Sequence, residues 1–293
     1  MVSRNNGVGL TTDMDLLTKL LSSAGNRVHR VDWRVPRIPK CDVVIFVELF
    51  NPNLLKFAQK SVGIFNPEWF MVAWSPWVAK LDQVWAKSRM AEEIFLEMNP
   101  NTHYTGFLSK NLNDGSVVRK PTVVHVQGHS SDKNTERVLE TWRNNSDLPK
   151  LTVITQKGPP IPPGVTRFGR LPERTLKHVL NENDIHLCPS RVEGWGHYIS
   201  EALTVGAHVI TTDMSPMNEH VRPEWGTLIS PSHVEPRGVA QACDVTVESI
   251  ATAVRDAVSI PPDVRTRQRY AAQAHMAQRN AQFAQLALKL IEE

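Results

Sequence analysis

The sequence has no long apolar run, and none of its hydrophobic stretches approaches the ~20 residues that a membrane-spanning helix needs. Its first residues, MVSRNN, also lack the apolar segment of a secretory signal. Hydrophobic residues make up 41% of the chain and charged residues 22%, which is ordinary for a globular protein. We therefore expect a cytoplasmic protein without a membrane span, and at 293 residues it is long enough for two domains.

Cysteine is also scarce. The three cysteines, Cys41, Cys188 and Cys243, are odd in number and far apart in the sequence. This pattern does not fit a disulfide framework, and no histidine pair with ligand-like spacing stands beside them. The simplest interpretation is buried, reduced thiols of a cytosolic protein, and we expect no metal.

Positive charge is concentrated in one window, although the whole chain carries only +3. Between residues 27 and 40, five basic residues stand against the single acid Asp32, which gives this window +4; they are Arg27, Arg30, Arg34, Arg37 and Lys40. Most charge runs are solvated loops. The alternative is a surface that attracts an anionic acceptor.

Short apolar runs alternate with helical patterns along most of the chain, which predicts an α/β fold with parallel sheets. The first part contains predicted strands at 43–47, 62–65, 83–86 and 103–105, and predicted helices at 14–21 and 54–60. The second part contains predicted strands at 122–126, 151–154, 165–168 and 184–188, and predicted helices at 134–144, 172–180, 199–205, 245–258 and 271–291.

A polar stretch from 110 to 120, followed by Pro121, separates the two parts and is interpreted as a linker. We predict an N-terminal Rossmann-like domain over residues 1–112, on the acceptor side, and a C-terminal Rossmann-like domain over 121–270. Residues 271–293 are predicted to form a helix that packs back across both.

The segment with the most information lies between two glutamates, Glu193 and Glu201, that have seven residues between them. The run 184–190 before them is typical of a buried strand, two glycines follow Glu193, and a helical pattern ends at Gly206. Such a strand, glycine loop and helix N-terminus form an anion site, because backbone N–H groups and the helix dipole both favour negative charge there. The two carboxylates can accept hydrogen bonds from hydroxyl groups, so the segment fits a phosphorylated sugar.

This segment resembles the E-x7-E signature of the retaining group 1 glycosyltransferases, which have the GT-B fold. The likeness extends over Pro189-Ser190, the Glu-Gly-aromatic-Gly run, Glu-Ala-Leu, Gly206-Ala207 and 209–212. It implies two doubly wound Rossmann-like domains that face each other across a cleft. It also implies a nucleotide-sugar donor such as a UDP-, GDP- or ADP-sugar as co-substrate, with no separate cofactor and no metal.

By this resemblance, Glu193 contacts the donor sugar and Lys133 stabilises the departing diphosphate, as a fixed cation should. Glu201 binds the ribose hydroxyls. His129 stands where the family usually has arginine, and it can replace the arginine only when protonated or as a neutral donor. The remaining donor-site residues that the resemblance implies are Arg170 and Leu171 beside the nucleobase, Gly194, Trp195, Gly196 and His197 around the sugar and phosphate, and Glu219.

In the first part, Gly7 and Gly9 form a glycine-bearing turn before a helix, which predicts one wall of the donor site. Asp13-Met14-Asp15 spells a D-x-D motif, but acids are common in the first turn of a helix and we expect no metal there. Glu68 follows a predicted strand and is our candidate for acceptor binding or proton handling.

We predict a retaining transferase that moves a sugar from a nucleotide-sugar to a hydroxyl acceptor, either a glycan or a small molecule. One alternative acceptor is hydroxymethylated DNA, as in phage DNA glycosyltransferases, because Arg30, Trp33 and Arg34 combine cations with an aromatic ring. A second alternative is a non-catalytic protein of this fold that binds nucleotide or carbohydrate. A phosphorylase or an epimerase on the same fold is a third.

Overall fold

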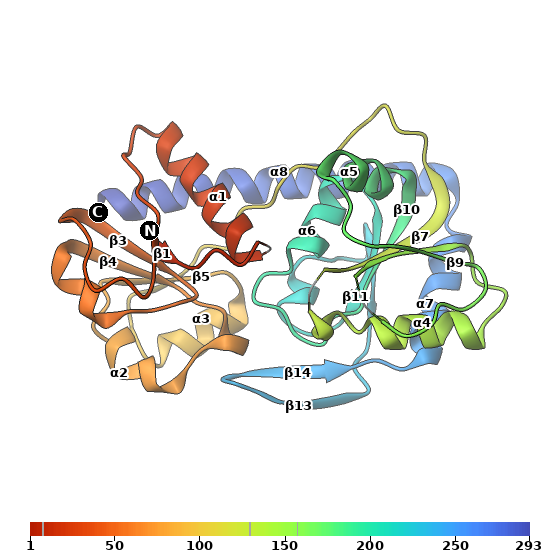
Figure 1. Cartoon of the computed structure of the whole chain (residues 1–293). Coiled ribbons are helices and arrows are strands. Elements are labelled where there is room, and N and C mark those ends of the chain that lie inside the picture. The colour runs from red at the N-terminus through yellow and green to blue at the C-terminus, as the bar shows by residue number, and fades with distance from the viewer. Residues whose placement is uncertain (8, 129, 157) are drawn as a thin grey trace. The chain divides into compact units, whose positions relative to one another are not determined.

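The computed structural model describes residues 1–7, 9–128, 130–156 and 158–293. The chain divides into two compact units. Unit 1 comprises Met1–Leu108, Pro236–Gln241 and Gln278–Glu293, and unit 2 comprises Ser109–Glu235 and Ala242–Ala277. In Figure 1, unit 1 contains the red to orange elements and most of unit 2 runs from yellow-green to blue.

Unit 1 is built on a six-stranded parallel sheet with the order β2-β1-β3-β4-β5-β6. The strands are β1 (Val2–Ser3), β2 (Val31–Asp32), β3 (Cys41–Val47), β4 (Ala58–Ile64), β5 (Gln83–Ala86) and β6 (Thr102–Tyr104). Its helices are α1 (Gly9–Ser23), α2 (Ser75–Val78) and α3 (Arg89–Leu96), with 3-10 turns η1 (Pro52–Phe57), η2 (Pro67–Trp69) and η3 (Val72–Trp74). Helices α1 and α3 lie on opposite sides of the sheet (Figure 1).

The burial pattern of the two central strands explains this arrangement. Strands β3 and β4 each end in four consecutive buried residues, as expected for strands covered on both faces. One face packs on an aromatic cluster in which Phe50 lies 4.8 Å from Phe46 and 6.0 Å from Phe65 between ring centroids, both edge-on. Each such pair adds about 0.5–1.5 kcal/mol beyond area burial.

Unit 2 also has a six-stranded parallel sheet, in the order β12-β11-β10-β7-β8-β9. The strands are β7 (Lys120–Gly128), β8 (Leu151–Thr155), β9 (Val165–Phe168), β10 (Asn183–Cys188), β11 (His208–Thr212) and β12 (Gly226–Ile229). Its helices are α4 (Thr135–Asn144), α5 (Glu173–Glu182), α6 (His197–Thr204) and α7 (Val247–Ser259), with 3-10 turns η4 (Ser131–Lys133) and η5 (Met217–Glu219).

Two further elements have residues in both units. They are the hairpin of β13 (His233–Arg237) and β14 (Ala240–Asp244), and the helix α8 (Pro262–Glu292). None of the helices in the described part of the chain has the length and apolar character needed to cross a membrane.

In unit 2, helices cover the two faces of the sheet. Side chains of α4 and α7 pack with one set of strand residues, which includes Val123. Val124, the next residue along β7, packs with side chains of α5 in a second set of strand residues. Since neighbouring side chains of a strand point to opposite faces, α4 and α7 cover one face and α5 covers the other. The α/β fold with two parallel sheets that was predicted from the sequence is therefore confirmed.

The strand orders locate the positions where ligands bind in such sheets. The chain of unit 2 runs outward from β7 in one direction and from β10 in the other, so its strand order reverses between these two strands. In unit 1 the reversal lies between β1 and β3. Ligands of open α/β sheets bind beyond the carboxyl ends of the strands at such a switch point.

Two local predictions were wrong. Residues 54–60 were predicted as a helix, but Pro52–Phe57 form a 3-10 turn and the strand β4 begins at Ala58. The backbone of Ala58 is extended, so a helix cannot continue there. The closing helix was predicted to begin at 271, but it begins at Pro262. Proline is well tolerated in the first turn of a helix, so the helix can begin there.

Candidate functional site

The loop between β10 and α6 is anchored from its neighbour β11. Thr211 Oγ1 donates to the carbonyl of Cys188 at 2.7 Å, and Thr212 Oγ1 donates to the carbonyl of Ser190 at 2.8 Å. Gly196 then caps α6 with φ at +83°, a conformation that glycine adopts without a steric penalty. A β-carbon on Gly196 would lie 3.1 Å from Ile199 Cδ1. The predicted strand, glycine loop and helix are present, and the helix begins at His197, two residues before the predicted start.

The loops after β7 and β10 meet through an ion pair. Lys133, at the end of η4, contacts the carboxylate of Glu193, and their side chains are only 14% and 13% exposed. Ser190 Oγ donates to the same carboxylate oxygen at 2.5 Å. The Lys133 ammonium also lies 3.6 Å from the ring centroid of Tyr198. The structure therefore brings together two residues that are sixty positions apart and that the sequence singled out separately.

Glu201 lies one turn further along α6 and is partly buried. Burial raises the pKa of its carboxyl group, while the nearby charges of His197, Lys110 and Lys133 act in the opposite direction. Within the described residues its carboxylate forms no hydrogen bond, whereas its backbone carbonyl accepts from Thr204 Oγ1 at 2.7 Å. A carboxylate in this state can accept hydrogen bonds from ligand hydroxyl groups.

The side chain of Trp195 belongs to the core, being 3% exposed. Its indole N–H donates to Ser109 Oγ at 3.4 Å, and its backbone carbonyl accepts from His220 Nε2 at 2.6 Å. The His220 ring packs edge-on against the indole at 4.4 Å. Only the backbone of Trp195 is thus placed for a ligand, and no sequence pattern pointed to His220 as the residue that supports this loop.

The other predicted donor-site residues of unit 2 differ in their surroundings. Glu219 lies on η5 after β11 and accepts a hydrogen bond from Ser215 Oγ. Arg170 is exposed, while Leu171 packs against the core beside α5. Gly194 is buried. His129 lies outside the described residues.

In unit 1, the glycine turn stands at the carboxyl end of β1, as predicted. Gly7 has φ at +70°, and its N–H donates to Asn5 Oδ1 at 3.0 Å and to Thr11 Oγ1 at 2.8 Å. A side chain on Gly7 or Gly9 would enter open space. The conformation of Gly7 therefore follows from the turn and not from close packing.

The D-x-D motif is not a pair of surface acids in the first turn of a helix, which corrects the interpretation of Asp13. Asp13 lies one turn into α1, 2.6 Å from Lys87 Nζ, and these two side chains are 3% and 1% exposed. Asp15 is exposed and pairs with Arg30 at 2.6 Å. Among the described residues there is no group of three or more His, Cys, Asp or Glu that could hold a metal.

Glu68 lies on η2 after β4 and is buried, with 9% of its surface exposed. It therefore follows the carboxyl end of a strand, as the sequence indicated. A second buried glutamate, Glu48, directly follows β3 and was missed. The same signal could have found it, since it also comes immediately after a buried apolar run.

The three predicted acceptor residues are engaged within unit 1. Arg30 pairs with Asp15 and donates to Thr18 Oγ1 at 2.7 Å. Arg34 hydrogen-bonds to the carboxylate of Asp32 at 2.9 and 3.1 Å, which lowers the pKa of Asp32 to about 2. Trp33 is partly buried against the aromatic cluster. These contacts reduce the free positive charge of the basic window.

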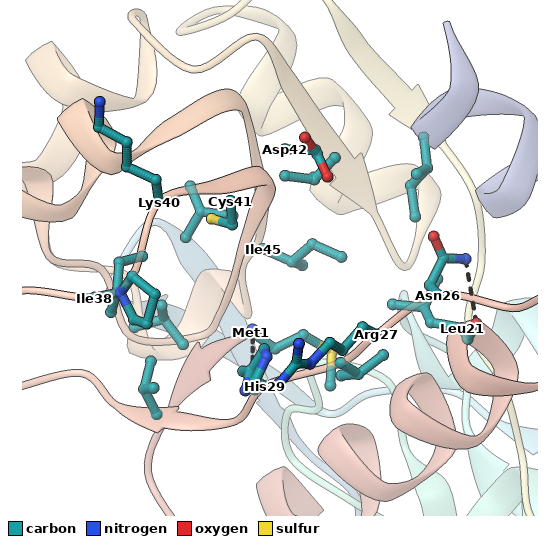
Figure 2. Close-up of a pocket in the computed structure, with 17 residues that line it drawn as sticks. Met1, Leu21, Asn26, Arg27, His29, Ile38, Lys40, Cys41, Asp42 and Ile45 are labelled. Atoms are coloured by element: carbon teal, nitrogen blue, oxygen red, sulfur yellow. Dashed lines mark hydrogen bonds between the residues drawn. The ribbon is translucent and has the colours of Figure 1, made fainter.

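A cavity of about 240 Å³ lies at the amino ends of β1, β2 and β3 (Figure 2). Arg27, His29 and Lys40 of the basic window contribute to its lining, together with Cys41 and Asp42. Because all strands of this sheet are parallel, this edge is the one opposite to Gly7 and Glu48. The cavity is therefore not at the edge where doubly wound sheets bind their ligands.

Residues 160–275 match the family model described as glycosyl transferases group 1. A search of curated protein sequences found no match. Among solved structures, a glycosyltransferase from Rickettsia africae aligns with 99% of this chain and 82% of its own, at 13% identity and a TM-score of 0.66.

Two further structures are similar. The pneumococcal O-GlcNAc transferase GtfA, solved with UDP and GlcNAc, aligns with 94% of this chain and 59% of its own, at 14% identity and a TM-score of 0.66. A Staphylococcus aureus TarM variant, solved with fondaparinux, alpha-GlcNAc-glycerol and UDP, aligns with 81% of this chain and 52% of its own, at 14% identity and a TM-score of 0.62.

The chain spans 52% of the TarM chain and 61% of the aligned chain in the GtfA/B complex. At these identities the likeness shows a shared fold. Together with the family match, it supports the resemblance to group 1 glycosyltransferases and confirms the GT-B class of fold.

Proposed function

We propose that the protein is a retaining, metal-independent glycosyltransferase that moves a sugar from a nucleotide-sugar to a hydroxyl group of an acceptor. The observation that carries this proposal is the contact between Lys133 and Glu193 at the switch point of unit 2. It joins a cation from one loop and a carboxylate from the other, next to the N-terminus of α6. The match of residues 160–275 to group 1 glycosyltransferases supports the same chemistry.

In this proposal, Lys133 stabilises the nucleoside diphosphate as it leaves. The charge on the leaving phosphate increases in the transition state, and a preoriented ammonium in a poorly solvated site stabilises that charge strongly. Glu193 holds Lys133 in place and accepts a hydrogen bond from the donor sugar. The backbone of Gly194 to His197 and the positive end of α6 surround the sugar phosphate.

Glu201 binds the ribose hydroxyls, since its carboxylate has no hydrogen-bond partner among the described residues. The other proposed donor-site residues are Gly7 and Gly9 of unit 1, and Arg170, Leu171, Glu219 and His129 of unit 2. Glu68 remains the proposed group for acceptor binding or proton handling. The acceptor attacks from the face that the diphosphate leaves, and an oxygen of the leaving phosphate takes its proton.

The similar structures favour UDP as the nucleotide, because GtfA and the TarM variant were both solved with UDP. The three free cysteines, of which Cys188 and Cys243 are buried, favour a reducing compartment and hence the cytoplasm. DNA as the acceptor remains an alternative, but the ion pairs of Arg30 and Arg34 weaken the basis for it. A non-catalytic nucleotide- or carbohydrate-binding protein remains another.

The test is incubation of the full chain with UDP-, GDP- and ADP-sugars, with and without glycan, glycerol and hydroxymethylpyrimidine DNA acceptors. We expect slow release of nucleotide with one donor and faster transfer when an acceptor is present. NMR of the product should show that the anomeric configuration of the donor sugar is retained. The Glu201→Ala and Lys133→Ala variants should each be slower by orders of magnitude while they keep the wild-type circular dichroism spectrum. No turnover with any donor would leave only a binding function, and sugar phosphate formed from the glycan when inorganic phosphate is added would indicate a phosphorylase.

A further inference from the structure

Glu48 has a backbone conformation that glutamate rarely adopts. It is the first residue after β3, and its φ is +62°. Among the described residues other than glycine, only Glu48 and Asn134 have positive φ, and asparagine tolerates this region much better. A residue held there costs the fold of order 1–3 kcal/mol, and such strain is concentrated at functional sites.

The backbone around Glu48 is fixed, so its unusual conformation sets the direction of the side chain. Its N–H donates to the carbonyl of Ile64 at 2.7 Å, which continues the ladder between β3 and β4. The residue stands at the carboxyl edge of the sheet, next to the switch point between β1 and β3. In a fold of this type, that is the position where a ligand of unit 1 is expected.

The carboxylate of Glu48 is mostly buried but incompletely hydrogen-bonded. Asn66 Nδ2 donates to its Oε2 at 2.7 Å, and this is its single hydrogen bond to the described residues. Asn66 Oδ1 is itself buried without a hydrogen-bond partner among them. Two acceptor oxygens from neighbouring strand ends, Glu48 Oε1 and Asn66 Oδ1, thus have no donor among the described residues. Of the two, Asn66 Oδ1 is fully buried, and a buried acceptor in native structures usually has a donor.

The surrounding charges do not satisfy Glu48 either. Burial raises the pKa of its carboxyl group, and the charge of Asp13 acts in the same direction. Lys87, Arg4 and the hydrogen bond from Asn66 act in the opposite direction. However, Lys87 is already paired with Asp13 at 2.6 Å and lies 4.6 Å from the ring of Phe107. The ammonium therefore lowers the cost of a carboxylate here without forming its ion pair.

Two acceptors without donors select the chemistry of a ligand. An anionic group such as a phosphate would be repelled, because it brings further acceptors and negative charge to a carboxylate. A divalent cation would be repelled by the charge of Lys87, which already occupies the nearby carboxylate of Asp13, and the described residues hold no group of three or more His, Cys, Asp or Glu that could bind it. Hydroxyl groups supply the missing donors and carry no charge, so a neutral polyol such as a sugar fits best.

We propose that Glu48 and Asn66 form a hydroxyl-binding site in unit 1 that takes an uncharged sugar or a similar polyol as the acceptor. This inference rests on the proposed function for its biological meaning, since it identifies the class of acceptor. Glu48 accepts a hydrogen bond from an acceptor hydroxyl, and Asn66 keeps the carboxylate in the required orientation. The site does not suit a nucleic-acid backbone.

The first experiment measures ligand binding by the full chain with saturation-transfer NMR and calorimetry. The probes are methyl α- and β-glucosides, methyl N-acetylglucosaminides, glycerol, glucose 6-phosphate and Mg²⁺ alone. We expect binding of at least one neutral probe, and an affinity roughly ten- to a hundredfold lower in Glu48→Gln, the range for losing one hydrogen bond to a charged group. Glu97→Gln, on an exposed position of the same unit, is the matched control and should bind as the wild type does.

A second variant separates binding from a structural role. In Glu48→Gly, the positive φ is no longer strained and a buried carboxyl group is removed, so the thermal midpoint of the full chain should rise while binding of the neutral probe is lost. A carboxylate retained for structure would give a lower midpoint. No binding of any neutral probe by the wild type, binding of glucose 6-phosphate or Mg²⁺ only, or unchanged binding in Glu48→Gln would each overturn the proposal.

UDP titrations of the same samples distinguish this inference from the proposed function. We expect Glu48→Gln to bind UDP with wild-type affinity, because the residues proposed for the nucleobase, the ribose and the diphosphate, namely Leu171, Glu201 and Lys133, all lie in unit 2. A wild type that binds UDP but no neutral probe would refute the hydroxyl site alone. A wild type that binds a neutral probe but none of UDP, GDP and ADP would refute the nucleotide-sugar function and leave the site in place.

Discussion

Removing the cation of the buried pair in unit 1 should destabilise that unit strongly. Lys87 and Asp13 are 1% and 3% exposed, and their charged atoms are 2.6 Å apart. In Lys87→Met, the flexible apolar side chain can still contact the ring of Phe107, but the carboxylate of Asp13 loses the ammonium group that pairs with it. Breaking one side of a buried ion pair costs about 3–5 kcal/mol, because an uncompensated charge stays in the interior.

Replacing both partners should restore most of the stability. In Asp13→Leu/Lys87→Met no charge of the pair remains, and apolar replacements of buried pairs are often neutral or stabilising. Lys80→Met is the surface control, since Lys80 is exposed and lies over Trp77 at 4.5 Å. We expect that control to change the free energy of unfolding by less than about 0.5 kcal/mol.

The assay is urea unfolding of the full chain followed by tryptophan fluorescence. Five of the eight tryptophans report on unit 1, namely Trp33, Trp69, Trp74, Trp77 and Trp85. Because a chain of two units need not unfold in one step, the transition of unit 1 is fitted separately. A loss of less than about 1 kcal/mol in Lys87→Met would refute this prediction. So would a double variant that loses as much stability as the single variants Asp13→Leu and Lys87→Met lose together.

Two further predictions concern unit 2. Gly196→Ala places a side chain at φ +83° and 3.1 Å from Ile199 Cδ1, so we expect thermal unfolding to show a loss of about 1–2 kcal/mol. A wild-type midpoint would show that the loop adapts. Acidification should also destabilise unit 2. Burial lowers the pKa of three histidines, His125, His186 and His208, from 6.5 to about 4. As the pH falls, the unfolded chain therefore binds protons at these histidines before the folded chain does. Their contribution is complete above pH 6.5 and falls by up to about 3 kcal/mol each toward pH 4, and equal urea midpoints at pH 7.5 and 5 would contradict this.

Much of unit 2 could be predicted from sequence because its signals are local. The buried strand before Pro189, the glycine cap at Gly196 and the helix that follows are encoded by neighbouring residues. The family resemblance of this segment also predicted roles for Glu193 and Glu201, which stay predictions. The contact between Lys133 and Glu193 could not be predicted from local signals, because the loops after β7 and β10 meet only when these two strands are neighbours in the sheet.

Unit 1 was less predictable because its chemistry depends on contacts between distant residues. The burial of Asp13 requires Lys87, which is 74 positions away, and a local pattern can only show an acid near the start of a helix. The strained backbone of Glu48 has no signal in composition or periodicity. The basic window was visible in the sequence, but its ion pairs with Asp15 and Asp32 were not considered.

The most direct test of the central claim is calorimetric titration of UDP, GDP and ADP into the full chain, with Lys133→Met and Glu201→Gln. Lys120→Met is the matched control. Lys120 lies on β7, the strand that precedes the loop of Lys133, but it pairs with Glu182 at an exposed position. We predict that the wild type and the control bind one nucleoside diphosphate with equal affinity, and that Lys133→Met and Glu201→Gln each bind it at least tenfold more weakly. Equal affinity in all four proteins, or no binding by the wild type, would contradict this prediction.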